Sequence, residues 1–285
     1  MKTNKMWMIT AILVAVAATA AFAQTEADFN VGLTDDGAGV VIVKYTGKTA
    51  AVRIPATIQG MPVKEIGSSA FWKSGITSVV IPQGVTLIGS NAFSECYNLT
   101  SVTIPDSVTE IGSGAFSSSG LTSVTLPKGL TKTGGRMFSE CTKLKTVTIP
   151  EGVTVISDFM FASCSALTSI KIPNSVTSIG RGVFSNFSGW EGCDALTSIT
   201  LGSGITAIPD EFAKYCKSLT SIAIPEGVTK IGENAFSGCY ALTTVTIPDS
   251  IETIEFSQNS AFQWCSKLSL ASQAAIKRRG YRGNF

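Results

Sequence analysis

The sequence contains no histidine, and this absence bears directly on catalysis. Histidine is the commonest general base and a frequent metal ligand in proteins. Pairs of carboxylates could act as acid and base instead. The acidic pairs at residues 35–36 and 210–211 fall where turns and exposed faces are expected, and charged residues are common there because they are in contact with water. We therefore predict no catalytic residue, no cofactor and no metal site, and a protein that is not an enzyme.

A strong excess of charge of one sign is also missing. Lys and Arg number 22 against 20 Asp and Glu, which gives a formal net charge of +2. Nucleic acids and anionic lipids attract proteins through a basic field, which this composition does not supply. One dense basic run, around residues 277–282, is explained by the last turn and tail of a terminal helix. We expect no nucleic-acid partner.

Long apolar runs are confined to the N-terminus. Lys2 and Lys5 precede an apolar stretch, and Ala21-Phe22-Ala23 is a small-x-small cleavage signature. The most apolar part, residues 11–22, is shorter than the ~20 residues that span a bilayer, which disfavours a membrane anchor. We predict a signal peptide over residues 1–23 and no transmembrane segment in the mature chain, which would be secreted, on the cell surface or periplasmic.

What the sequence has in abundance is an internal repeat. An Ile-Pro or Leu-Pro dipeptide recurs mostly at steps of 22 or 23 residues, and a phenylalanine follows each one at a similar distance. The dipeptides begin at Ile54, Ile81, Ile104, Leu126, Ile149, Ile172, Ile224 and Ile247, with Leu201 in the same position. The phenylalanines are Phe71, Phe93, Phe116, Phe138, Phe161, Phe184, Phe212, Phe236 and Phe262.

The unit that begins at Leu99 shows what each repeat builds. Leu99, Val102 and Ile104 point one way and the residues between them the other, as in a short strand that Pro105 ends. Burying about five apolar side chains gains roughly 8 to 15 kcal/mol. Ordering two dozen residues costs more, at about 1 to 2 kcal/mol each, so one unit cannot fold without neighbours.

The fold class that follows is a leucine-rich-repeat type solenoid. We expect one short parallel β-strand per repeat of ~23 residues, short helical or 3-10 turns, and irregular return legs. The predicted domains are an N-terminal cap over residues 24–50, a solenoid of about nine repeats over 51–268, and a helical cap with a basic tail over 269–285. The N-terminal cap would contain strands at 40–45 and 52–54 paired with each other, and the C-terminal helix would run over 270–279.

All seven cysteines fall at one position of the repeat. Side chains at equivalent positions of stacked repeats run parallel instead of facing each other, which disfavours disulfides. Thiols arranged in a line also cannot converge on a tetrahedral metal ion. We expect buried free thiols that fill space and donate weakly to the turn backbone.

The repeated motif V-T-x-I-G-x-x-A-F-x-x-C-x-x-L-T-S-V-x-I-P, seen at residues 85–105 and 228–248, resembles the BspA-like leucine-rich repeats of bacterial surface and secreted proteins. The resemblance extends over about residues 50–268. It implies adhesion to proteins or to other cells as a possible function, without fixing a ligand.

Two parts of the chain are candidates for binding. The first is the outward side of the strands, which is rich in hydroxyl groups, although the same residues would suit any soluble strand surface. Its candidate residues are Thr103, Thr125, Thr148, Lys171, Thr200 and Thr246. The second is a six-residue insertion within 185–192, whose Phe187 and Trp190 either anchor a partner or fold back over the solenoid. We expect protein binding or adhesion, with a structural, self-associating envelope component as the alternative.

Overall fold

The computed structural model describes residues 25–185, 192–251, 253–254 and 260–285. The expected signal peptide lies outside these residues. No helix of the described part is long and apolar enough to cross a membrane. The elements near the N-terminus are η1 (Glu26–Asp28), β1 (Phe29–Leu33), β2 (Val40–Tyr45), β4 (Thr57–Ile58) and β5 (Met61–Ile66).

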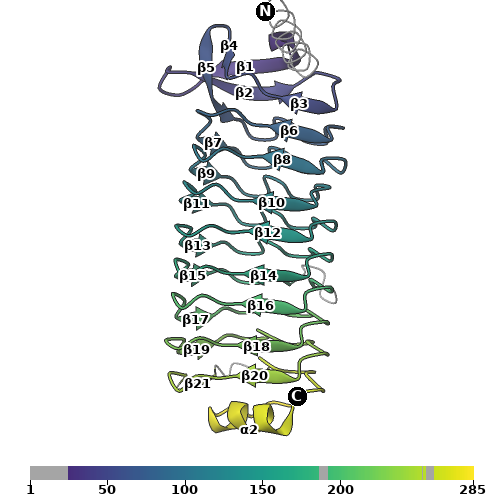
Figure 1. Ribbon diagram of the computed structural model, residues 1–285, viewed down its shortest axis with the longest axis vertical. Coiled ribbons are helices and arrows are strands. Elements are labelled where there is room, and N and C mark those ends of the chain that lie inside the picture. Colours follow the sequence, from purple (N-terminus) through teal and green to yellow (C-terminus); the bar gives the residue numbers. More distant parts are fainter. Residues whose placement is uncertain (1–24, 186–191, 252, 255–259) are drawn as a thin grey trace, which may run out of the picture.

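The predicted solenoid is confirmed: the chain winds into successive coils, each of which adds one strand to each of two parallel ladders (Figure 1). The first ladder consists of β3 (Ala51–Arg53), β6 (Ser78–Val80), β8 (Ser101–Thr103), β10 (Ser123–Thr125), β12 (Thr146–Thr148), β14 (Ser169–Lys171), β16 (Ser198–Thr200), β18 (Ser221–Ala223) and β20 (Thr244–Thr246). The second consists of β7 (Leu87–Ile88), β9 (Glu110–Ile111), β11 (Lys132–Thr133), β13 (Val155–Ile156), β15 (Ser178–Ile179), β17 (Ala207–Ile208), β19 (Lys230–Ile231) and β21 (Thr253–Ile254).

The second ladder makes the return legs more regular than we expected from the sequence. Its strands are only two residues long, too short for an alternating pattern to reveal them. The Ala-Phe segments that follow are hydrogen-bonded turns. In several of these turns a residue two positions before the phenylalanine has a positive φ, for example Asn91 at 55° and Arg136 at 58°.

Both ends of the solenoid are closed by non-repeated elements. The expected pairing of residues 40–45 with 52–54 is wrong: β2 pairs antiparallel with β1 and parallel with β5, and β3 joins the first ladder beside β6. Strand β1 was missed, and a hairpin joins it to β2. At the other end α2 (Leu270–Arg278) lies against β20, close to the range we expected.

Glycine follows most of the short return strands and determines how closely the coils approach there. The amide N of Gly89, Gly112 or Gly134 donates to the preceding repeat at 2.7 Å, and a Cβ on Gly134 would lie 2.2 Å from the backbone N of Ser113. The second ladder is interrupted between β11 and β13 and between β15 and β17. The equivalent positions there are Ser157, which carries a Cβ, and Pro209, which has no N–H to donate.

Inside the coils the nine phenylalanines are fully buried and form a continuous stack, the Phe ladder. Most neighbouring rings lie 4.8 to 6.0 Å apart, with angles of 4° to 20° between their planes. Phe212 breaks this geometry, because its ring is turned 81° from that of Phe184 and 77° from that of Phe236.

From the sequence we assigned Phe212 to the phenylalanine position of its repeat. This assignment is wrong by one residue. In the other repeats the backbone N of the ladder phenylalanine donates to the residue that precedes the next phenylalanine, as Phe93 N does to Ala115 O. Here it is Ala213 N that donates, to Ala235 O, while Phe212 O accepts from Phe184 N. Phe212 therefore occupies the alanine position and Ala213 the phenylalanine position, and the Phe212 ring reaches the stack from the adjacent position.

The seven cysteines are free and buried beside the Phe ladder. Each thiol donates to a backbone carbonyl of the preceding repeat, for example Cys96 Sγ to Phe71 O at 3.0 Å and Cys141 Sγ to Phe116 O at 3.1 Å. Burial raises the pKa of Cys96 to about 12 and that of Cys141 to about 11. These thiols connect successive coils and have little thiolate character.

Candidate binding surface

The outward side chains of the first ladder form an exposed surface, which we call the hydroxyl face. It includes all six ladder residues that we predicted from the sequence, and each of them is exposed: Thr103, Thr125, Thr148, Lys171, Thr200 and Thr246. A parallel row on the same strands is also exposed and consists of Ser101, Ser123, Thr146, Ser169, Ser198, Ser221 and Thr244. The ladder fixes the spacing of both rows.

The hydroxyls of this face differ from those of the threonines just before the strands. Thr100 Oγ1 donates to Thr77 O at 3.2 Å and Thr243 Oγ1 to Thr220 O at 3.0 Å, which uses these groups to join coils. Within the described residues, neither Thr103 nor Thr125 makes a side-chain hydrogen bond of this kind. Their hydroxyl groups are available to a partner at little cost in side-chain entropy.

A hollow interrupts the hydroxyl face between β8 and β10, where the first ladder is not hydrogen-bonded. We call it the β8–β10 hollow; its volume is about 250 Å³. It is lined by Ser101, Val102, Thr103, Ile104, Asp106, Ser123, Val124, Thr125 and Leu126. Thr103 and Thr125 were predicted from the sequence, but the hollow and Asp106 were not. Turn length does not signal the hollow, because the equally short turn Ser74-Gly75-Ile76 precedes β6, which pairs with both β3 and β8.

The insertion follows Ser185, at the end of the turn that contains Phe184. Phe187 and Trp190 lie outside the described residues, so their role stays a prediction. The described residues at its base are well anchored: Ser185 Oγ donates to Gly182 O at 3.2 Å, and Cys193 N donates to Phe184 O at 3.1 Å.

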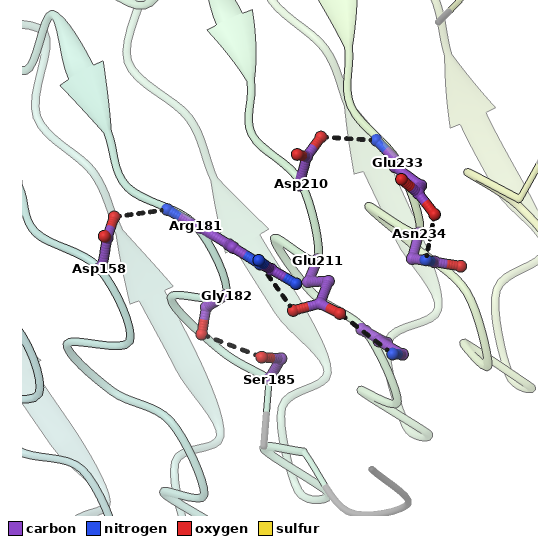
Figure 2. Close-up of polar contacts among 9 residues, drawn as sticks. Asp158, Arg181, Gly182, Ser185, Asp210, Glu211, Glu233 and Asn234 are labelled. Atoms are coloured by element: carbon purple, nitrogen blue, oxygen red, sulfur yellow. Dashed lines mark hydrogen bonds and ion pairs between the residues drawn. The ribbon is translucent and has the colours of Figure 1, made fainter. Parts of the chain in front are cut away.

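Charged side chains flank this base (Figure 2). Glu211 accepts from Arg181 Nε at 3.0 Å and from Lys214 Nζ at 3.2 Å. Burial alone would raise the pKa of Glu211, but the hydrogen bonds from the two cations outweigh it and hold this pKa below its ordinary value. Asp158 and Asp210 instead accept from the backbone N of the following coil, at Arg181 and Glu233, both at 2.8 Å. These carboxylates hold coils and side chains in place.

Exposed aromatic rings also lie in the turns that follow the ladder phenylalanines of other coils. Trp72 and Trp264 are 50% and 42% exposed. Glu95 holds two rings, because it accepts from Trp72 Nε1 at 3.1 Å and from Tyr97 OH at 2.8 Å. Trp264 stacks on Tyr215 at 6.1 Å.

No group of His, Cys, Asp and Glu side chains in the described part of the chain has the arrangement of a metal site. The hydroxyl face offers a partner hydrogen bonding and a fixed shape.

Comparison with known proteins agrees with this architecture. The family model described as the BspA type leucine rich repeat region, in six copies, matches residues 64–191 and 188–269. The chain belongs to this family. No curated protein matches it in sequence.

Several solved structures are similar. The T. pallidum leucine rich repeat protein is 26% identical, with 92% of this chain and 98% of that chain covered and a TM-score of 0.52. A leucine rich cell surface protein of Faecalibacterium prausnitzii is 28% identical, over 90% of this chain and 97% of that one, with a TM-score of 0.45. The pneumococcal vaccine antigen PcpA is 21% identical, over 79% and 69% of the two chains, with a TM-score of 0.54, and shows the shared fold alone.

Proposed function

We propose that this repeat protein is exported and binds a protein or another cell-surface macromolecule through its hydroxyl face. The observation that carries the proposal is the pair of exposed rows on the first ladder, whose short side chains are held at fixed spacing by the coils. A surface that is already ordered loses little entropy when a partner binds. The apolar segment and the small-x-small signature within residues 1–23 support the export part of the proposal.

Binding of the purified chain, residues 24–285, to an array of extracellular matrix and bacterial surface proteins tests this function. A variant with Thr125→Arg and Thr148→Arg places two bulky cations on the hydroxyl face. The matched control, Val155→Arg with Ser178→Arg, places them on exposed positions of the second ladder. We expect the face variant to lose at least ten-fold in affinity, about 1.4 kcal/mol, and the control to bind normally.

Equal binding by the two variants would overturn the assignment to the hydroxyl face. A chain that binds nothing in the array but self-associates in sedimentation would support the structural, self-associating alternative. The proposed location is tested separately, by cell fractionation and protease accessibility. Retention wholly inside the cytoplasm would contradict it.

The insertion is a second proposed contact. A Phe187→Ala and Trp190→Ala double variant should bind the same partner more weakly, since aromatic anchors in loops often dominate interface energies. Unchanged affinity would remove the insertion from the binding surface and leave the hydroxyl face untouched.

A further inference from the structure

The β8–β10 hollow lies at a break in the first ladder. The turn Ser119-Gly120-Leu121 before β10 lies so close to the preceding coil that a Cβ at Gly120 would be 2.2 Å from Tyr97 O. The strand that follows this turn is β10. It pairs with β12 on one side and is not hydrogen-bonded to β8 on the other. The hollow therefore lies between two neighbouring strands that do not pair.

The floor of the hollow is apolar. Val102 and Ile104 are partly exposed there, whereas Val124 and Leu126 are buried. Four residues that carry hydroxyl groups also line the hollow: Ser101, Thr103, Ser123 and Thr125. A side chain that enters must bring an alkyl part to cover the floor and polar hydrogens for the hydroxyl oxygens.

A carboxylate completes the lining. Asp106 Oδ1 accepts from Lys128 N at 3.0 Å, which fixes the position of the group. In the part of the chain that the structure describes, no cationic side chain pairs with Asp106. Its second oxygen is available to a donor from outside, and a charge-assisted hydrogen bond to it would be roughly twice as strong as a neutral one.

We propose that the β8–β10 hollow receives a lysine or arginine side chain of the protein partner. The alkyl stem would lie on Val102 and Ile104, and the cationic head would reach Asp106, as long basic side chains do where an apolar surface ends in a polar one. An anionic side chain would be repelled by the Asp106 carboxylate, and a neutral side chain would leave this carboxylate without a cationic partner. This inference rests on the proposed function and names the chemistry of the partner.

The test uses small probes on the folded chain and needs no identified partner. Nα-acetyl-lysine methylamide and its uncharged counterpart Nα-acetyl-norleucine methylamide are titrated while backbone amide NMR shifts are followed. We expect saturable binding of the lysine probe in the millimolar range, shifts confined to β8, β10 and the turn at Asp106, and at least ten-fold weaker binding of the norleucine probe.

Matched variants separate the carboxylate from general electrostatics. Asp106→Asn should weaken the lysine probe at least ten-fold. Glu226→Gln makes the same change of charge at the equivalent exposed position after Ile224-Pro225 and should leave the binding unchanged. Melting curves of both variants report whether they are folded.

Three results would overturn the inference: no saturable shifts at β8 and β10, equal binding of the two probes, or equal losses in the two variants. The proposed function fails by a different measurement. If the lysine probe does not bind but the Thr125→Arg and Thr148→Arg variant still loses the array partner, the hydroxyl face stands and only the basic side chain is wrong.

Discussion

Phe212 and Ala213 have exchanged the two positions that alanine and phenylalanine hold in most of the other repeats. The exchange keeps the apolar volume of the pair and turns one ring by about 80° within the Phe ladder. Both side chains are fully buried, so their volumes must complement each other.

A double-variant cycle at this pair should therefore show strong coupling. Phe212→Ala alone removes a buried ring and should cost about 3 to 5 kcal/mol. Ala213→Phe alone overfills the same space and should cost about 1 to 3 kcal/mol. The double exchange restores the order of the other repeats and should lie within about 1 kcal/mol of the original chain in urea unfolding. Additive losses would show that the two positions do not share one space.

The glycine positions should differ sharply in their tolerance of a methyl group. Gly134→Ala places a Cβ against the backbone of the preceding coil and should destabilise the chain by about 1 to 3 kcal/mol. Gly75→Ala is the control, because nothing lies within 4 Å of its Cβ, and it should be neutral or slightly stabilising. The melting temperatures of the two variants test this difference. Equal melting temperatures would contradict the close approach of the coils.

The thiols should be inert in the folded protein. Burial raises the pKa of Cys216 and of Cys265 to about 12, so almost no thiolate exists at pH 8. Iodoacetamide followed by mass spectrometry should label few or none of the seven cysteines in buffer and all seven in denaturant. Rapid labelling of the native chain would show that the cysteine position opens to solvent, and masses short of seven labels in denaturant would reveal a disulfide.

The parts of the fold that could be predicted from the sequence are those whose sequence pattern extends over many residues. The first ladder, the cysteine position and the terminal helix each rest on a pattern repeated several times or on capping residues, and these predictions agree with the structure. Return strands of two residues carry no period of their own. The exchange at Phe212 was invisible because a shift of one residue is smaller than the variation in repeat length.

The candidate site was predictable only in part. Alternation along the strands identified the outward residues, since it depends on the local backbone alone. The β8–β10 hollow depends on a missing strand pairing between two coils, which no residue pattern within either strand signals. Its carboxylate, Asp106, looked like an ordinary turn residue after Pro105, because Asp is common in turns.

Acid should weaken the ion-pair network at the base of the insertion. The pKa of Glu211 is lowered in the folded chain, so the stability that its charge contributes is fully present above the unfolded value of about 4.5 and is lost as pH falls through the folded pKa. Glu211→Gln should lower the melting temperature at pH 7, and the difference from the original chain should shrink below pH 4.

The exposed Glu226→Gln variant serves as the comparison, with no shift in melting temperature expected at either pH. A Glu211→Gln variant as stable as the original chain at pH 7 would remove Glu211 from the stabilising contacts.

The last coil also determines where growth of the ladder stops. Beyond β20 a further strand would find its hydrogen-bonding groups taken, since Ser272 Oγ accepts from Val245 N at 3.1 Å and Ser269 N donates to Thr243 O at 2.9 Å. The helix thus works as a terminator. Without it, the open rim of one molecule would be a template for the next, and a particle of defined length would become a fibre.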